Sequence, residues 1–415
     1  MGIGGVGMSG VALLLRSHAV AVSGSDLRES PLLRKVRSVG CAVSLQPDPE
    51  SVSLASWLIV PDAVPDGHPE VAQAAAAGLL VLSREEALKR ILSGTEKRGV
   101  CGVLNRGGAL HGIVEALQDP DVGCFSGAIP RNGQPHARLG VPMFVELDER
   151  FVEDLSEYSS LLVADCPPDS LGYASQADPI AHLRALAKRS GTLLIYPEKD
   201  AAHCLRFASS RGSGRFRLRY DGVRRVVRAE SSEGVQEVDL GASLDLFHLR
   251  NVAAVGAYLH LAEGWSGARL IEGMLRASHA RIVGQFEVRA HGERRFIHDV
   301  RTHPIGVRAI VDAAETPKQG LQVVLRPYPF TFNAYGDAHW CEAFKGVGRV
   351  QLLPAYPGGR GDEGERLAKL LSGIGVQVLQ TDEYCSDPEF ATTLFIGGED
   401  LAALADAAAA VPRDR

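Results

Sequence analysis

The chain has 415 residues, of which 45% are apolar and 23% charged, so it is long enough for two or three domains with cores of their own. Its net charge of -6 and the lack of a long block of lysine and arginine argue against a nucleic-acid partner. The seven cysteines include no CxxC pair, so neither a disulfide framework nor a zinc site is indicated. No apolar run is long enough to cross a bilayer and no signal peptide is visible, so we expect a cytoplasmic protein without membrane contact.

Short apolar runs alternate with helical patterns near the start of the chain. The apolar runs are ASWLIV (55–60) and LLVLS (79–83), and the helical patterns that follow them are EVAQAAAAG (70–78) and REEALKRIL (84–92). This order predicts an α/β fold in which helices pack on parallel sheets. The most basic stretch, RFRLRYDGVRRVVR (215–228), alternates between charged and apolar residues, which predicts strands with solvated arginines.

Two polar connectors divide the chain. The first is SGTEKR (93–98), and the second is SHARIVGQ (278–285), which follows two helical patterns. We therefore predict three domains, each within the usual size range, at residues 1–95, 96–283 and 284–415.

A glycine pattern opens the chain. Gly2, Gly4 and Gly7 form GxGxxG, in which the missing side chains let backbone amides at a helix N-terminus approach a phosphate. Asp26 follows at the distance where an acid at a strand end would contact a ribose. Taken alone, this pair of features is typical of a dinucleotide site and leaves an NAD-dependent oxidoreductase open. The strand that should precede the glycine loop is missing from the sequence as given.

The segment RGVCGVLNRGGALHGIVEAL (98–117) has the outline of a phosphate-binding loop. An apolar run leads into a glycine-containing turn and then into a helical pattern. The lysine that grips phosphate in such loops is absent. A plain connection from strand to helix is therefore the simpler interpretation of this segment.

Further motifs follow in chain order. FVELDER places Glu146, Asp148 and Glu149 in an ExDE pattern, and RNVAAVGA contains Asn251. Four more motifs lie in the last third of the chain: HDVRTHPIGV (298–307), LRPYPF (325–330), AYPGGR (355–360) and IGGEDL (396–401). Together with the N-terminal glycine motif, this series resembles the Mur ligases, most closely those that join UDP-N-acetylmuramate to L-alanine.

The resemblance implies both an architecture and a reaction. It implies a Rossmann-like N-terminal domain that binds the UDP-sugar, a central ATPase domain of the P-loop type, and a Rossmann-like C-terminal domain. In this family, ATP phosphorylates the lactyl carboxylate of the sugar, and the amine of the amino acid then displaces phosphate to form an amide. Such chemistry depends on positioning and on charge neutralisation by the loop lysine and Mg²⁺.

The resemblance also assigns the site residues. Catalytic positions are Glu146, Asn251 and His303, and the metal ligands are Glu146 and Asp169, whose carboxylate oxygens suit Mg²⁺. Residues at the UDP-sugar and at the nucleotide loop are Gly4, Gly5, Gly7, Ser9, Asp26, Arg106, Gly107 and Gly108.

Several of these motifs have lost charged groups. Where the family has a TGTHGKT-like run, this chain reads VLNRGGA (103–109) or, shifted by one, GVLNRGG (102–108). The lysine position therefore falls on Gly108 or Gly107, with Arg106 next to it. Ser170 replaces a histidine associated with the metal, and Pro329 replaces an arginine that would pair with an anion. Because the glycines, prolines and apolar runs that define the fold remain, we predict a Mur ligase homologue with impaired or absent ATP chemistry and doubtful binding of ATP and Mg²⁺.

Three hypotheses follow. The first is a non-catalytic homologue that binds UDP-N-acetylmuramate or a related UDP-sugar weakly and contacts proteins of cell-wall synthesis. The second is a divergent but active UDP-N-acetylmuramate:amino-acid ligase in which Arg106 replaces the lysine. The third is the oxidoreductase, which the glycine pattern and Asp26 alone would allow.

Overall fold

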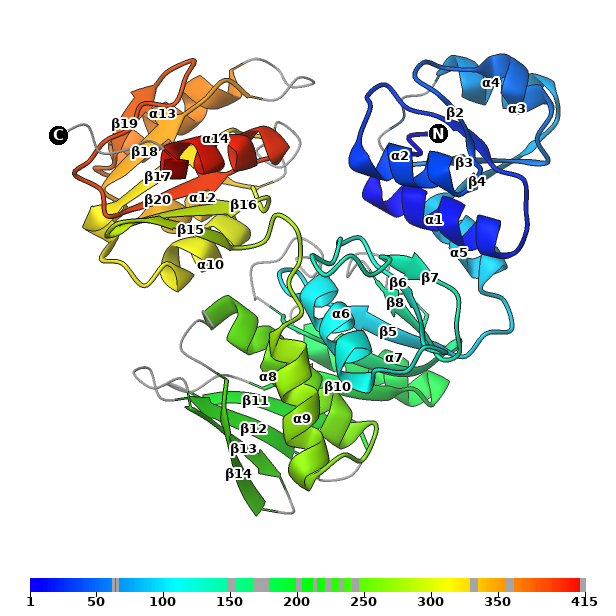
Figure 1. Cartoon of the computed structure of the whole chain (residues 1–415), viewed down its shortest axis with the longest axis horizontal. Coiled ribbons are helices and arrows are strands. Elements are labelled where there is room, and N and C mark those ends of the chain that lie inside the picture. Colours follow the sequence, from blue (N-terminus) through cyan, green and yellow to red (C-terminus); the bar gives the residue numbers. More distant parts are fainter. Residues whose placement is uncertain are drawn as a thin grey trace.

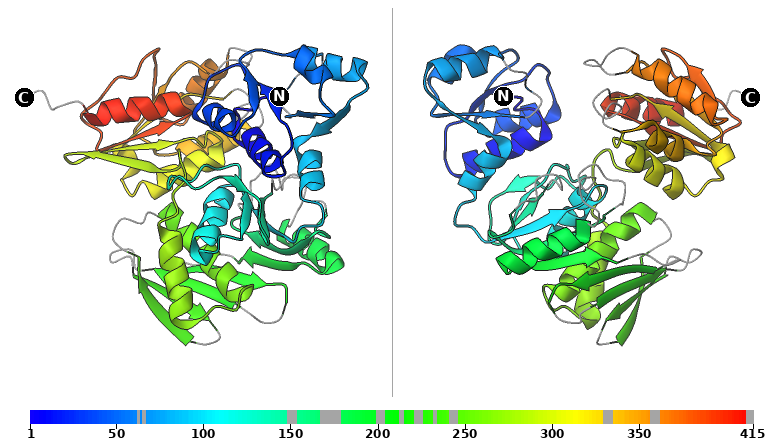
Figure 2. Two further views of the ribbon diagram at one scale, coloured as in Figure 1. Left: turned by 45° about the vertical axis from the view of Figure 1, so that its right-hand side comes forward. Right: turned by 180° about the vertical axis from the view of Figure 1, so that it is seen from behind.

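The computed structural model describes residues 1–61, 64, 67–147, 154–166, 179–198, 204–211, 215–220, 226–231, 234–240, 246–328, 335–355 and 362–410. Figure 1 shows three lobes, with the N-terminal and C-terminal lobes on the same side of the central one. Both views of Figure 2 show the same arrangement. Mixed α/β structure with parallel sheets confirms the predicted fold class. In the part of the chain that is described, no helix has the length and apolar character to cross a membrane.

The N-terminal lobe alternates helices and strands. Its elements are α1 (Val6–Ser17), β1 (Ser23–Ser25), α2 (Pro31–Ser38), β2 (Ala42–Ser44), α3 (Pro49–Ser53), β3 (Trp57–Val60), α4 (Pro69–Ala76), β4 (Leu80–Ser83) and α5 (Arg84–Ile91). Strands β1 and β2 pair in parallel, as do β3 and β4. Local capping sets the helix starts, since Ser83 and Glu86 form a capping box at α5.

Helix α1 is the first element of the described structure. The first residues lie between the two small sheets. The backbone N–H of Ile3 donates to the carbonyl of Ser25 in β1 at 3.1 Å, and the amine of Met1 donates to the carbonyl of Ile59 in β3 at 3.0 Å. These contacts place the glycine loop directly at the ends of β1 and β3.

A ten-stranded sheet forms the centre of the second lobe, in the order β14-β13-β12-β11-β10-β9-β5-β8-β6-β7. Strands β10, β9, β5, β8 and β6 are parallel, and the strands beyond them on either side are antiparallel. The strands are β5 (Lys97–Cys101), β6 (Gly123–Phe125), β7 (Ala137–Arg138), β8 (Met143–Glu146), β9 (Tyr158–Val163), β10 (Leu193–Pro197), β11 (Cys204–Ser209), β12 (Arg215–Tyr220), β13 (Val226–Ser231) and β14 (Gly234–Asp239).

The helices of this lobe are α6 (Arg106–Leu117), α7 (Pro179–Ser190), α8 (Leu246–Leu261) and α9 (Gly267–Ser278). Helices α6, α8 and α9 pack against the sheet around a buried apolar core. Strands β12 and β13 confirm the strands predicted from the basic stretch, and their alternation buries Phe216 and Leu218 while Arg215 and Arg219 are exposed.

The C-terminal lobe has a six-stranded sheet in the order β15-β16-β20-β17-β18-β19, parallel except for the β15-β16 pair. Its strands are β15 (Glu287–His291), β16 (Arg294–Asp299), β17 (Leu321–Leu325), β18 (Arg349–Leu352), β19 (Gln377–Gln380) and β20 (Thr392–Ile396). Its helices are α10 (Pro304–Ala313), the short 3-10 helix η2 (Lys318–Gly320), α12 (Asp337–Phe344), α13 (Glu363–Gly373) and α14 (Glu399–Ala410).

The central lobe packs on both of the others. Val11 and Leu14 of α1 share an apolar cluster with Phe125 and Ala137 of the central lobe. On the other side, Leu104 lies in the apolar cluster of the C-terminal lobe, together with Phe247 at the start of α8. The turn between β5 and α6, where the sequence predicted a nucleotide loop, therefore lies at the junction of the central and C-terminal lobes.

Candidate functional site

The turn between β5 and α6 surrounds the carboxylate of Asp165. This aspartate lies two residues beyond the end of β9, which pairs with β5. One oxygen, Oδ1, accepts from the backbone N–H groups of Val103 at 2.9 Å and Leu104 at 3.1 Å, and Oδ2 accepts from Asn105 at 2.7 Å. Three consecutive amides pointing at one anion are the arrangement with which such turns bind phosphate.

The turn is adapted to this carboxylate by a glycine that leaves room for it and by nearby groups that favour its charged form. Gly102 has a φ of +146°, and a Cβ on it would lie 3.0 Å from Oδ2 of Asp165, so a larger residue would push against the carboxylate. Burial raises the pKa of Asp165, whereas the three amide hydrogen bonds and the nearby Arg106 act in the opposite direction and favour its charged form.

Arg106 and Glu146 form an ion pair beside this turn. Arg106 is the first residue of α6, and its Nε donates to Oε1 of Glu146 at 2.8 Å. Glu146, at the end of β8, also accepts from the Ser126 hydroxyl at 2.6 Å and the Gly127 N–H at 2.8 Å. The carboxylate predicted to bind Mg²⁺ thus has a guanidinium and two hydrogen-bond donors as its partners.

The residues described here do not fit a magnesium site. Because a guanidinium already offsets the charge of Glu146, a cation there would have to displace Arg106. No cluster of three or more acidic, histidine or cysteine residues suited to a metal occurs within the described ranges. Asp169, Asp148 and Glu149 lie outside the described residues, as do Ser170 and Pro329.

Gly107 and Gly108 are buried in the first turn of α6, with no room for side chains. A Cβ on Gly107 would lie 2.5 Å from the Cβ of Ala128. A Cβ on Gly108 would lie 2.9 Å from Cγ of Asn251 in α8 and closer still to its amide nitrogen. The fold therefore brings the predicted residue Asn251 against the loop, where its side chain fills the space next to Gly108.

His303 caps the helix that faces this region. It precedes α10, and its Nδ1 accepts from the N–H of Gly306 at 3.0 Å. Burial lowers the pKa of His303 to about 4, and the guanidinium groups of Arg301 and Arg106 act in the same direction. The imidazole is consequently neutral at pH 7, and its described hydrogen bond is that of a helix cap.

The predicted UDP-sugar residues fall into two groups. The N–H of Gly4 donates to Oδ2 of Asp26 at 2.8 Å, so these two are brought together, while Gly5 lies against the carbonyl of Gly2. Ser9 instead is fully buried, and its hydroxyl contacts Nε2 of His136 in the central lobe at 3.1 Å. Ser9 therefore lies in the contact between two lobes.

Residues 1–95 match the model described as "Mur ligase family, catalytic domain". The UDP-N-acetylmuramate--L-alanine ligase of Renibacterium salmoninarum is 27% identical over 382 residues, which cover 86% of this chain and 81% of that protein. The chain is a homologue of the Mur ligases. Its departures from their motifs are therefore changes within a shared framework.

Two solved structures share the fold of the Mur ligase homologue over nearly its full length. UDP-N-acetylmuramate-alanine ligase MurC from Thermotoga maritima has a TM-score of 0.68 and 18% identity, over 98% of this chain and 96% of that one. A murein peptide ligase from Psychrobacter arcticus has a TM-score of 0.66 and 14% identity, over 100% and 98% of the two chains. These likenesses confirm the predicted three-domain architecture.

Sequence reasoning missed two charged residues of the Mur ligase homologue that contact predicted loops. One is Asp165, whose only local signal is an acid directly after the apolar run LLVA (161–164). The other is Arg84, the first residue of α5, whose guanidinium lies over the glycine loop: a Cβ on Gly7 would be 2.9 Å from its NH1. Arg84 also pairs with Glu85.

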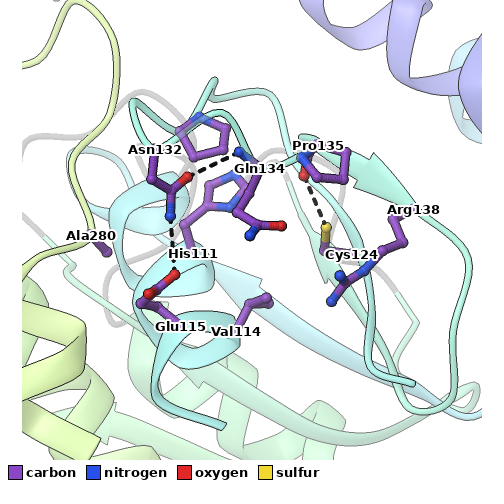
Figure 3. Close-up of a pocket in the computed structure, with 10 residues that line it drawn as sticks. His111, Val114, Glu115, Cys124, Asn132, Gln134, Pro135, Arg138 and Ala280 are labelled. Carbon is purple, nitrogen blue, oxygen red and sulfur yellow. Dashed lines mark hydrogen bonds between the residues drawn. The ribbon is translucent and has the colours of Figure 1, made fainter. Parts of the chain in front are cut away.

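A small pocket lies between α6 and residues 124–138 (Figure 3). His111 and Glu115 of α6 line it, together with Cys124 and Asn132, and Asn132 donates to Glu115 at 3.0 Å. Burial lowers the pKa of His111 to about 4, which leaves a neutral ring whose Nε2 donates to the carbonyl of Ala128. None of the predicted site residues lines this pocket.

Proposed function

We propose that this Mur ligase homologue acts in the synthesis of peptidoglycan precursors without forming amide bonds at the expense of ATP. The ion pair between Arg106 and Glu146 is the observation that supports this most directly. Phosphoryl transfer depends on cations that neutralise the transferred phosphate. Here the cation at the start of α6 and the carboxylate expected to hold Mg²⁺ neutralise each other.

The position of Arg106 refines the alignment of the loop. A third alignment, in which CGVLNRG (101–107) corresponds to the TGTHGKT-like run, puts Arg106 in the place of the lysine. It agrees with the structure, because a P-loop lysine stands where the helix begins and Arg106 opens α6. This alignment favours the second candidate, a divergent active ligase, only if Arg106 can leave Glu146 and reach a phosphate.

We propose that the chain still binds the UDP-sugar although it no longer uses ATP. The glycine loop lies at the N-terminus of α1, and the guanidinium of Arg84 lies beside it, with part of its charge offset by Glu85. However, the N–H of Gly4 already donates to Asp26, so fewer amides remain for a pyrophosphate. Weak binding of UDP-N-acetylmuramate, together with contacts to other proteins of cell-wall synthesis, is the role that fits these features.

The domain bounds 1–95, 96–283 and 284–415 are part of the same proposal. The sheets support these bounds, since the two small sheets end at Ser83, the ten-stranded sheet runs from Lys97 to Asp239, and the six-stranded sheet begins at Glu287.

The carboxylate of Asp26 already has partners within the protein, because it accepts from the N–H groups of Gly4 and Arg28. For this reason an oxidoreductase role is not part of the proposal.

A ligation assay tests the function. The full chain is incubated with UDP-N-acetylmuramate, L-alanine and Mg-ATP, and amide product and ADP are measured, with the relative from Renibacterium salmoninarum as the positive control. We expect neither product from this chain. Amide product that Arg106→Lys retains and Arg106→Ala abolishes would establish the divergent ligase instead.

A further inference from the structure

The carboxylate of Asp165 has the coordination that a phosphate oxygen would have in this turn. Its two oxygens accept from the amides of residues 103, 104 and 105, and the N-terminus of α6 and the Arg106 side chain lie next to it. An anion at this place gains from three hydrogen bonds, from the helix dipole and from a nearby cation. The chain supplies that anion from its own sequence.

The same turn joins two lobes. The side chain of Leu104, between two of the amides that bind Asp165, is buried in the apolar core of the C-terminal lobe. Phe247 belongs to the same apolar cluster, and Arg301 lies over its ring, with 3.7 Å between the guanidinium carbon and the ring centre. Arg301 also pairs with the buried Asp299. The conformation of residues 102–105 therefore decides whether Leu104 can reach the C-terminal lobe.

We propose that Asp165 is a positioning residue that replaces a nucleotide phosphate in the turn, and that it thereby keeps the C-terminal lobe docked on the central lobe without nucleotide. This inference rests on the proposed function, because the turn cannot hold Asp165 and a nucleotide phosphate together. It adds that the Asp165 carboxylate takes the place of a ligand in the turn, and that the turn helps to hold the C-terminal lobe on the central lobe.

The chemistry of the side chain matters for this role. A carboxylate offers two acceptor oxygens, and both are used here. Asparagine would keep one acceptor and would turn two N–H donors of its own toward amides that also donate, so at least one amide would lose its partner. The variant Asp165→Asn is thus close in shape but wrong in hydrogen bonding, whereas Asp165→Ala empties the turn.

Rescue by inorganic phosphate tests the proposal on the full chain. Hydrogen exchange at the amides of residues 103–105 and the thermal midpoint are measured with and without inorganic phosphate or pyrophosphate. For Asp165→Ala we expect exchange at these amides to increase on the order of tenfold, because three partly buried hydrogen bonds are lost, and phosphate to reverse much of this. The wild type should not respond to phosphate.

Asp154→Ala is the matched control, since Asp154 also accepts from a backbone N–H, that of Ser156, but lies away from the turn. It should show no phosphate rescue. Asp165→Asn should raise hydrogen exchange at the same three amides, and this variant is used for the test if Asp165→Ala does not fold. Unchanged exchange in both variants, or an equal phosphate effect on wild type and variant, would overturn the proposal. If the ligation assay is negative as well, only this inference fails; amide product from the wild type would instead refute the proposed function.

Discussion

Because Gly108 lies against Asn251, we expect Gly108→Ala to destabilise the protein when Asn251 is present and to stabilise it when Asn251 is replaced by alanine. A methyl group on Gly108 would lie 2.9 Å from Cγ of Asn251, where ordinary contacts lie at 3.4–4 Å. Asn251 or α6 must therefore shift by about half an ångström or more, and crowding of this kind costs about 1–3 kcal/mol. Alanine gains up to about 1 kcal/mol over glycine in a helix. We expect Gly108→Ala to destabilise the protein by about 1–2 kcal/mol.

The sign reverses when Asn251 is removed. In an Asn251→Ala background the obstructing amide is gone, so only the helix gain remains, and Gly108→Ala should stabilise by up to about 1 kcal/mol. The coupling between the two positions is then on the order of 2 kcal/mol, within the range measured for residues in contact.

Thermal unfolding of the wild type, both single variants and the double variant provides the test, at about 2–4 °C per kcal/mol for a domain of this size. Gly364→Ala is the control, because Gly364 is also near the start of a helix, α13, and a Cβ there would meet only Nε2 of Gln380 at 3.9 Å. This control should raise the midpoint. If Gly108→Ala lowers the thermal midpoint equally in the wild type and in the Asn251→Ala background, the steric argument is refuted.

Three further predictions concern binding, pH and catalysis. UDP-N-acetylmuramate should bind weakly but measurably in calorimetry, and Gly7→Val should reduce its affinity because the new side chain displaces the guanidinium of Arg84; no binding at millimolar ligand would contradict this. The pKa of His111 is about 4, against about 6.5 in an unfolded chain, so the stability from its neutral form is complete above pH 6.5 and is lost as the pH falls toward 4. The thermal midpoint of His111→Gln should therefore fall less than that of the wild type between pH 7 and pH 5, and parallel curves would show that His111 does not titrate in this way. Lysine introduced singly at Gly107 or Gly108 should yield no amide product by mass spectrometry, because neither position has room for a side chain and Asp165 still fills the turn. Groups that act as a unit in catalysis are also not restored one at a time, and product from either variant would show the defect to be local.

Local patterns in the sequence located the elements of this fold. The strand, glycine turn and helix at 98–117 are neighbours along the chain, so their spacing alone predicts β5, the turn and α6. Alternation predicted β12 and β13 for the same reason. The family resemblance then assigned Glu146, Asn251 and His303 as catalytic positions, and the structure brings Glu146 and Asn251 into contact with α6.

The occupants of the turn could not be predicted in this way, because they come from distant parts of the chain. Asp165 is 60 residues from Asn105 and reaches it only because β9 pairs with β5. Arg106 and Glu146 are 40 residues apart, on a helix and a strand whose relative placement depends on the sheet order. A missing lysine is visible in a sequence, whereas the carboxylate that fills the turn and the ion pair beside it become visible only after folding.

Calorimetric titration of the wild-type chain with Mg-ATP tests the central claim most directly. With Asp165 bound by the three amides of the turn and Glu146 bound by Arg106, a nucleotide would have to displace two sets of partly buried charge-assisted hydrogen bonds. We predict no binding heat up to millimolar Mg-ATP. Saturable binding with a dissociation constant in the low micromolar range would contradict the account.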